Sequence, residues 1–286
     1  MPARPADQAV AGFAGLDAPI GVAGPAEVLD WLAVFLDWPV AAAPAAPDVR
    51  VEPGGRGFRI VGGNGPDAVR TTATAIDAAN FATAAMIEAL VAADPALARV
   101  HAAALDGPAG LVLLVGASGA GKSSIALHLA RAGHRLFADD QIVLRLAGRP
   151  VEGIALGLRP KVRRPIPASF GPSFEAFVRT RTALTTDDFL ALALDATLQA
   201  PFASRRPVAA IVLVERLPEG PARLERTAAA SALRRLLAET IGQPDRTAGR
   251  VAALAQLCAA VPAFQLIYAD SVAAAAALRA TVPAFA

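Results

Sequence analysis

Eight consecutive residues, Gly116 to Ser123, read GASGAGKS and fit the pattern G-x-x-x-x-G-K-S without departure. The apolar run LVLLV precedes them, and the segment SSIALHLARAG, which has the apolar spacing of a helix and ends at Gly133, follows. A glycine-rich turn between a buried strand and a helix lets backbone N–H groups point inward, where the positive end of the helix dipole adds to them. The segment therefore predicts a loop that holds phosphate groups.

Two side chains of this loop have the chemistry that a triphosphate requires. Lys122 can reach the β- and γ-phosphates as a compact charge, and the Ser123 hydroxyl can bind Mg²⁺. Among the 27 basic residues only Lys122 and Lys161 are lysine, which favours phosphate binding over a turn that merely packs the helix on the strand. The residues expected to hold the nucleotide are Gly116, Ala117, Ser118, Gly119, Ala120, Gly121, Lys122, Ser123 and Ser124.

Two aspartates, Asp139 and Asp140, close the next apolar run, RLFADD. A right-handed crossover would make this run a strand parallel to LVLLV and bring its carboxyl end beside the loop. Neighbouring residues on an extended strand point to opposite sides, so one carboxylate can face Mg²⁺ and the other an incoming hydroxyl. The alternative is an acidic strand end that faces water or caps a helix, and it is the weaker one after a matched phosphate loop.

The strands and helices expected around these residues divide the chain into two regions. Short apolar runs alternate with helical segments in residues 97–286, which favours an α/β, P-loop-containing core. Residues 1–96 are predicted to form a smaller α+β region: a short helix carrying Trp31 and Trp38, a hairpin over 49–61 and a helix over 67–93. In the core we expect strands at 99–106, 110–116, 134–140, 141–147, 207–216 and 264–270, and helices at 122–132, 186–199, 228–241 and 247–260.

Composition narrows the class of protein. With 286 residues and 55% hydrophobic content the chain can bury a large core, and a net charge of +2 with scattered basic residues does not indicate a nucleic-acid partner. The single cysteine, Cys258, and the absence of a leader pattern predict a cytoplasmic protein. The longest uncharged run, Val251–Ala269, contains Pro262 and is predicted to be a helix, a break and a strand, so no membrane span is expected.

The stretch from His101 to Asp140 resembles the C-terminal catalytic domain of HPr kinase/phosphorylase and its shorter HprK-like relatives. In that family a histidine on a strand precedes G-x-S-G-x-G-K-S, and the segment R-G-H-R-L-x-A-D-D follows. The equivalents here are His101, the glycine loop, and RAGHRLFADD from Arg131. The match covers about 40 residues, and it implies an HprK-like kinase core.

The resemblance implies an enzyme that transfers the γ-phosphoryl group of ATP, with Mg²⁺, to a serine-type hydroxyl on a peptide, a protein or a small molecule. By position Asp139 matches the family's general base, Asp140 its metal-associated partner, and His101 the histidine near the catalytic centre. Lys122 and Ser123 keep the roles given above. The hexameric assembly of the family implies a homo-oligomer.

Two segments depart from the family's pattern. Its E-[IV]-R-G-x-G signature is represented only by VEGIALGLRPKVRRP, and its arginine-bearing loop at best by Arg205 and Arg206. Kinase chemistry is therefore better supported than the reverse phosphorolysis, and the acceptor is left open. Two other classes stay in view: a nucleotide-binding adaptor without phosphotransfer, and a P-loop ATPase.

A basic cluster, Arg159, Lys161, Arg163 and Arg164, has two interpretations of equal weight. It either contacts nucleotide phosphates, a phosphorylated product or an acidic acceptor, or it is a solvated loop, as most charge runs are. The two remaining histidines, His128 and His134, are assigned to structure.

Overall fold

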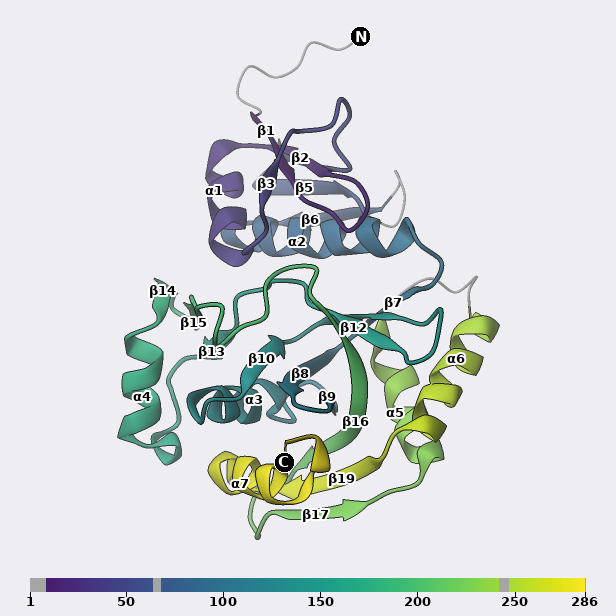
Figure 1. Ribbon diagram of the computed structural model, residues 1–286. Coiled ribbons are helices and arrows are strands. Elements are labelled where there is room, and N and C mark those ends of the chain that lie inside the picture. The colour runs from purple at the N-terminus through teal and green to yellow at the C-terminus, as the bar shows by residue number, and fades with distance from the viewer. Residues whose placement is uncertain (1–8, 64–67, 242–246, 286) are drawn as a thin grey trace. The chain divides into compact units, whose positions relative to one another are not determined.

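The computed structural model describes residues 9–63, 68–241 and 247–285 (Figure 1). Its internal contacts divide the chain into two compact units, Met1–Pro95 and Ala96–Ala286. Each unit has a β-sheet of its own.

The first unit packs two helices with a six-stranded sheet in the order β3-β1-β2-β4-β5-β6. The strands are β1 (Ala9–Phe13), β2 (Ile20–Gly24), β3 (Val40–Ala41), β4 (Val49–Gly54), β5 (Gly57–Gly62) and β6 (Val69–Thr72), and the helices are α1 (Ala26–Phe35) and α2 (Ala75–Ala92). The predicted hairpin is confirmed as β4 and β5, which are joined at Gly55 and Arg56.

Two expectations for this unit were wrong. Trp38 lies beyond the end of α1, because Pro39 disfavours helical backbone at the residue before it. The predicted helix over 67–93 begins only at Ala75, where the Thr74 side chain caps it by accepting from the amide of Asp77 at 3.1 Å. Residues 69–72 form β6 instead, and Asp67 lies outside the described residues.

By length and composition, α2 could cross a membrane. Half of its apolar window is buried inside the unit, where the helix packs on α1, β4 and β5. A helix in a domain core meets the same criteria, so these properties alone do not indicate a membrane span.

The second unit is built on a mixed ten-stranded sheet whose main path is β10-β8-β9-β16-β12-β11-β7-β18. A parallel centre consists of β16 with β9 on one side and β19 on the other, and β17 pairs with β19 at the edge. The strands are β7 (Leu97–Val100), β8 (Ala102–Gly107), β9 (Gly110–Val115), β10 (Arg135–Ala138), β11 (Ile142–Arg145), β12 (Glu152–Ile154), β16 (Arg205–Arg216), β17 (Arg223–Arg226), β18 (Thr240–Ile241) and β19 (Ala263–Tyr268). A separate small sheet contains β13 (Lys161–Arg163), β14 (Thr182–Thr185) and β15 (Phe189–Leu192).

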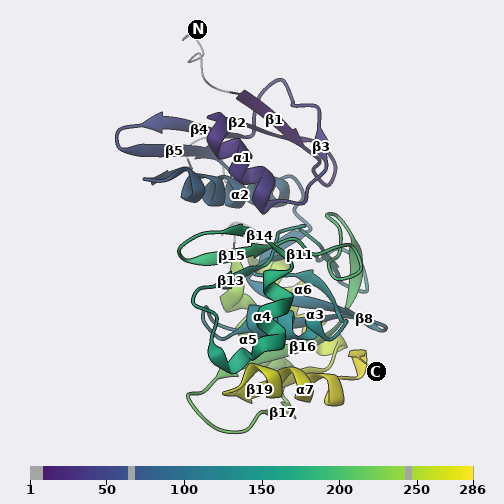
Figure 2. The same ribbon diagram turned by 90° about the vertical axis from the view of Figure 1, so that its left-hand side faces the viewer.

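Helices cover both faces of the large sheet (Figures 1 and 2). On one face lie α3 (Lys122–Arg131), α4 (Pro172–Arg179) and α7 (Ser271–Thr281), and on the other lie α5 (Ala229–Glu239) and α6 (Thr247–Ala260). Within the described residues the unit also contains the single-turn 3₁₀ segments η1 (Ala168–Phe170) and η3 (Pro283–Phe285). The predicted α/β fold class is confirmed.

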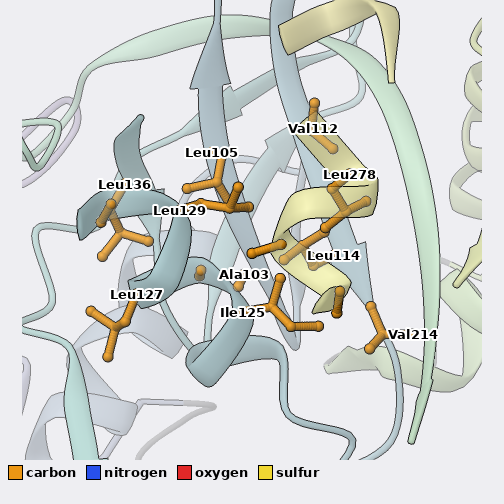
Figure 3. Packing of buried hydrophobic residues seen from close by; sticks show 14 of the residues in the cluster. Ala103, Leu105, Val112, Leu114, Ile125, Leu127, Leu129, Leu136, Val214 and Leu278 are labelled. Atoms are coloured by element: carbon orange, nitrogen blue, oxygen red, sulfur yellow. The ribbon is translucent and has the colours of Figure 1, made fainter. Parts of the chain in front are cut away.

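The apolar run of β9 shows why this strand is central. Val112 and Leu114 face the cluster that contains α3 and α7, whereas Leu111, Leu113 and Val115 face the cluster under α5 and α6. Figure 3 shows Val112 and Leu114 beside Ile125 and Leu129 of α3 and Leu278 of α7. Because each fully buried side chain of this size contributes about 1.5–3 kcal/mol, burial on both faces holds the strand firmly in place.

The strand that leads to the aspartates runs as predicted but has a different neighbour. Both β9 and β10 are antiparallel to β8, so they point in the same direction. The strand β8 lies between them, which the sequence did not indicate. Residues 99–106, predicted as one strand, are divided at His101 into β7 and β8, because the two segments pair with different strands.

The predicted helix over 186–199 was also wrong. Phe189–Leu192 forms β15, which pairs with β13 and β14, and Asp195 then accepts a hydrogen bond from the Thr197 amide in a turn. A short apolar run fits a strand as well as a helix, so tertiary pairing decided the outcome. The helices α4 and α7 and the strands β12, β13 and β17 were not predicted.

Candidate active site

The loop between β9 and α3 has the backbone that a phosphate cradle requires. Gly119 and Gly121 have φ values of 81° and 85°, in the left-handed region that favours glycine. A Cβ on Gly121 would lie 1.9 Å from Tyr268 Oη, and one on Gly116 would lie 2.5 Å from the Val214 carbonyl oxygen. Because α3 begins at Lys122, the unpaired amides of its first turn adjoin the loop.

Tyr268, the only tyrosine of the chain, braces this loop. Its hydroxyl donates to the Ala120 carbonyl at 2.7 Å, and the residue is 1% exposed. The side chain comes from the last position of β19, beyond β16 in the sheet. Sequence reasoning missed this residue, since nothing near it in the chain marks the contact.

A cavity of about 270 Å³ lies over the loop. Six of the nine predicted nucleotide-binding residues line it, namely Ser118, Gly119, Gly121, Lys122, Ser123 and Ser124. Lys122 Nζ donates to the carbonyls of Gly116 (2.6 Å) and Ala117 (3.1 Å), and burial lowers its pKa. The other lining residues are His101, Leu127, Asp140, Lys161, Val162, Arg163, Pro165, Pro167, Phe170, Phe174 and Arg216.

The two aspartates point apart, but not because they lie on an extended strand. Strand β10 ends at Ala138, and Asp140 has a φ of 67°. The Gln141 amide donates to the Asp139 carbonyl at 2.8 Å, which closes a tight turn around Asp140. A non-glycine residue in this region is strained, and such strain is concentrated at functional sites.

Asp139 is buried beside the amino end of α3. The Ser123 hydroxyl is close enough to its carboxylate to lower the pKa, and Oδ2 lies 3.4 Å from the Lys161 amide. The other oxygen, Oδ1, is buried and has no hydrogen-bond partner among the described residues. Burial is the main cause that raises the pKa of Asp139 to about 6. Asp139 is not among the residues that line the cavity.

Asp140 instead forms a chain of polar contacts with His101 and Glu239. His101 Nε2 lies 3.4 Å from Asp140 Oδ1, and its Nδ1 lies 2.9 Å from Glu239 Oε2. The His101 amide also donates to the Glu239 carbonyl at 2.8 Å. The hydrogen bond with Asp140 is the largest cause that raises the pKa of His101, and the same bond lowers the pKa of Asp140. Glu239, at the end of α5, was not predicted.

The basic cluster divides between the cavity and the scaffold. Lys161 and Arg163 line the cavity, and Lys161 Nζ lies 5.0 Å from the centre of the Phe189 ring. Arg164 donates to the Thr186 carbonyl at 2.6 Å, and Arg159 is not among the lining residues. Arg206, considered above as part of an arginine loop, pairs with Asp106 at 2.8 Å.

The two histidines assigned to structure are packed against aromatic rings. His128 lies 5.0 Å from Phe170 and 4.4 Å from Phe174 between ring centres, and His134 lies 4.8 Å from Phe285. Burial lowers the pKa of His128 to about 4, so its ring is neutral at neutral pH.

The donor set at Ser123 and Asp139 fits Mg²⁺. The residues that the structure describes include no group of three or more His, Cys, Asp or Glu that could hold a metal ion. Mg²⁺ does not need such a group when a nucleotide is bound, because it is usually held by one or two carboxylates, substrate phosphates and water. A hydroxyl beside a buried carboxylate oxygen that lacks a partner meets this requirement, whereas the Asp140 carboxylate is engaged with His101.

The comparison with known proteins indicates the same family as the sequence motifs. No family model matches the chain. HPr kinase/phosphorylase from Exiguobacterium sibiricum is 49% identical over 51 residues, which are 18% of this chain and 15% of that protein. The chain thus matches only a small part of the length of this relative.

Among solved structures, the Hpr(Ser) kinase/phosphatase from Coxiella burnetii matches 60% of this chain and 85% of its own, with 14% identity and a TM-score of 0.28. At that TM-score the match does not bear on the fold. The relative with the short segment of high identity belongs to the family that the sequence motifs indicate, and the resemblance of this chain to the HPr kinase/phosphorylase family is thereby confirmed.

Proposed function

We propose that this chain is an ATP-dependent kinase that transfers the γ-phosphoryl group to a serine-type hydroxyl on a peptide, a protein or a small molecule. The observation that supports it most is the convergence at one place of the phosphate loop, the hydroxyl–carboxylate pair of Ser123 and Asp139, and the Asp140–His101–Glu239 chain. Phosphoryl transfer depends on positioning and charge neutralisation, and these groups supply both.

The loop and α3 would hold the triphosphate. Backbone amides of residues 117–123 and the Lys122 ammonium group offset the charge of the β- and γ-phosphates. Ser123 and Asp139 are the residues that would hold Mg²⁺. When bound, the ion neutralises charge on the phosphate oxygens.

We assign the general base to Asp140, the reverse of the roles expected from the sequence. A base must reach the acceptor hydroxyl, and Asp140 lines the cavity whereas Asp139 does not. The pKa values favour the opposite choice, because a pKa of about 6 suits a base and that of Asp140 is lowered. Position has priority here, since the charge of a bound triphosphate raises the pKa of a carboxylate beside it.

In the transfer step, the acceptor oxygen forms a bond to the γ-phosphorus while the bond from phosphorus to the β–γ bridging oxygen breaks. The electron pair leaves with ADP, and the hydroxyl proton passes to the Asp140 carboxylate. His101 holds this carboxylate through Nε2 and is itself held by Glu239 through Nδ1. His101 and Glu239 therefore act by positioning the base.

The test is incubation of the protein with γ-labelled ATP and Mg²⁺, with and without a panel of hydroxyl-bearing peptides, proteins and small molecules. A kinase transfers label only when an acceptor is present. Release of free phosphate without transfer would instead indicate an ATPase, and binding without turnover a nucleotide-binding adaptor. We expect Asp140→Asn to bind ATP normally and to lose transfer by about 100-fold or more, the usual scale of acid–base catalysis. Full activity of that variant would refute Asp140 as the base.

A further inference from the structure

The second lysine of the chain lies in the same cavity as the first. Among 27 basic residues only Lys122 and Lys161 are lysine. Lys122 belongs to the phosphate loop, but Lys161 comes from β13, about 40 residues further along the chain. Because Lys161 lines the cavity without belonging to the phosphate loop, we infer that it has a function of its own.

Strand β13 presents two cations to the cavity. Lys161 and Arg163 both line the cavity, and the buried Val162 side chain between them lines it as well. The Lys161 amide lies 3.4 Å from Asp139 Oδ2, which fixes the start of this strand beside the two aspartates. The Phe189 ring supports the Lys161 ammonium group through a cation–π contact.

Lys161 and Arg163 line the same cavity as Asp140 and His101. Burial lowers the pKa of Lys161, and the negative charges of Asp140 and Asp139 partly offset that effect. Arg216 also lines the cavity, from the end of β16.

An anionic acceptor would meet strong repulsion at this site without such cations. The triphosphate and the Asp140 carboxylate are both negative, and like charges at close range oppose each other by several kcal/mol when water is excluded. Lys161 and Arg163 offset this repulsion at the place where the acceptor must enter. A neutral acceptor would gain nothing from them.

We propose that Lys161 and Arg163 form the acceptor subsite, and that the acceptor carries an anionic group, a carboxylate or a phosphate, close to its reactive hydroxyl. This inference rests on the proposed kinase function. The apolar residues Val162, Pro165, Phe170 and Phe174, which also line the cavity, would hold the carbon skeleton of the acceptor.

The test is calorimetric titration of inorganic phosphate into the full chain saturated with AMP-PNP and Mg²⁺, so that the γ-phosphate position is already filled. We expect one phosphate to bind, and Lys161→Met or Arg163→Gln to weaken it by about tenfold, as for loss of one charge-assisted contact. The affinity for AMP-PNP should change less than threefold, or about 0.6 kcal/mol. Lys161→Arg, which keeps the charge, should retain most of the phosphate binding.

Arg164→Gln is the matched control, because it removes the same charge at the next residue. The guanidinium of Arg164 donates to the Thr186 carbonyl and is not part of the proposed subsite. Equal weakening in this control would show a general charge effect and overturn the subsite. The absence of phosphate binding to the saturated protein would also overturn it, as would an equal loss of AMP-PNP affinity in Lys161→Met. Failure of the wild type to bind AMP-PNP would refute the kinase function itself, and the prior titration of AMP-PNP alone detects it.

Discussion

The buried carboxylate of Asp139 should make the protein less stable at neutral pH than its amide variant. Burial raises the pKa of this group from 3.8 in the unfolded chain to about 6 in the folded protein. The folded state is therefore most stable below the pKa of Asp139 in the unfolded chain, and it loses stability as the pH rises through the pKa of this group in the folded protein. Each pKa unit corresponds to about 1.4 kcal/mol, so the loss reaches about 3 kcal/mol above pH 6.

The variant Asp139→Asn has no such titration. We expect its free energy of unfolding to exceed that of the wild type by about 1 kcal/mol near pH 4.5 and by about 3 kcal/mol near pH 7.5, as an upper estimate. Urea denaturation followed by circular dichroism at both pH values measures the difference. The same variant should bind Mg²⁺ and nucleotide more weakly, so that stability and function change in opposite directions.

Asp140→Asn is the matched control because the neighbouring carboxylate titrates with the opposite sign. The hydrogen bond with His101 lowers the pKa of Asp140. The ionised carboxylate therefore stabilises the folded state above the pKa that Asp140 has in the unfolded chain, and this stabilisation is lost as the pH falls. We expect this variant to be less stable than the wild type at neutral pH. An Asp139→Asn protein that is no more stable than the wild type near pH 7.5, or a difference that does not grow with pH, would refute the burial of an uncompensated carboxylate.

Three further substitutions test the contacts around the loop. Lys122→Ala should weaken ATP binding by about 10- to 100-fold, the cost of losing a charged donor, in a fluorescent-nucleotide titration; unchanged binding would place the triphosphate elsewhere. Glu239→Gln should lower the pKa of His101, because a raising contact is lost, and NMR titration can follow it among only three histidines; an unchanged pKa would contradict the contact. Tyr268→Phe should weaken nucleotide binding by about fivefold through loss of one hydrogen bond to the loop, and equal affinity would show that the brace is not needed.

The part of the site that could be predicted from the sequence is formed by residues that are consecutive in the chain. The strand, loop and helix from Gly110 to Arg131 follow from local periodicity and from glycines that need positive φ. Glu239 and Tyr268 act across 138 and 148 residues, through pairings of β18 with β7 and of β19 with β16. No local pattern encodes those pairings.

The side-chain directions of Asp139 and Asp140 could be predicted from the sequence only in part. The alternation of a strand predicted that their side chains would diverge, and they do, but a tight turn at Asp140 causes it. That turn buries one carboxylate beside Ser123 and directs the other to His101. Assignment of their roles therefore depends on burial and on partners, which a dipeptide alone cannot specify.

The division of labour between these carboxylates is tested most directly by a crystal structure of the protein with AMP-PNP and Mn²⁺ in place of Mg²⁺. We expect the β- and γ-phosphates on the amides of residues 117–123 and the metal at about 2.0–2.3 Å from Ser123 Oγ, the range for small divalent cations, with Asp139 next to it and Asp140 facing the γ-phosphate without contact to the metal. Phosphates bound away from this loop, or a metal ion coordinated by Asp140 while Asp139 stays apart, would contradict the proposed site.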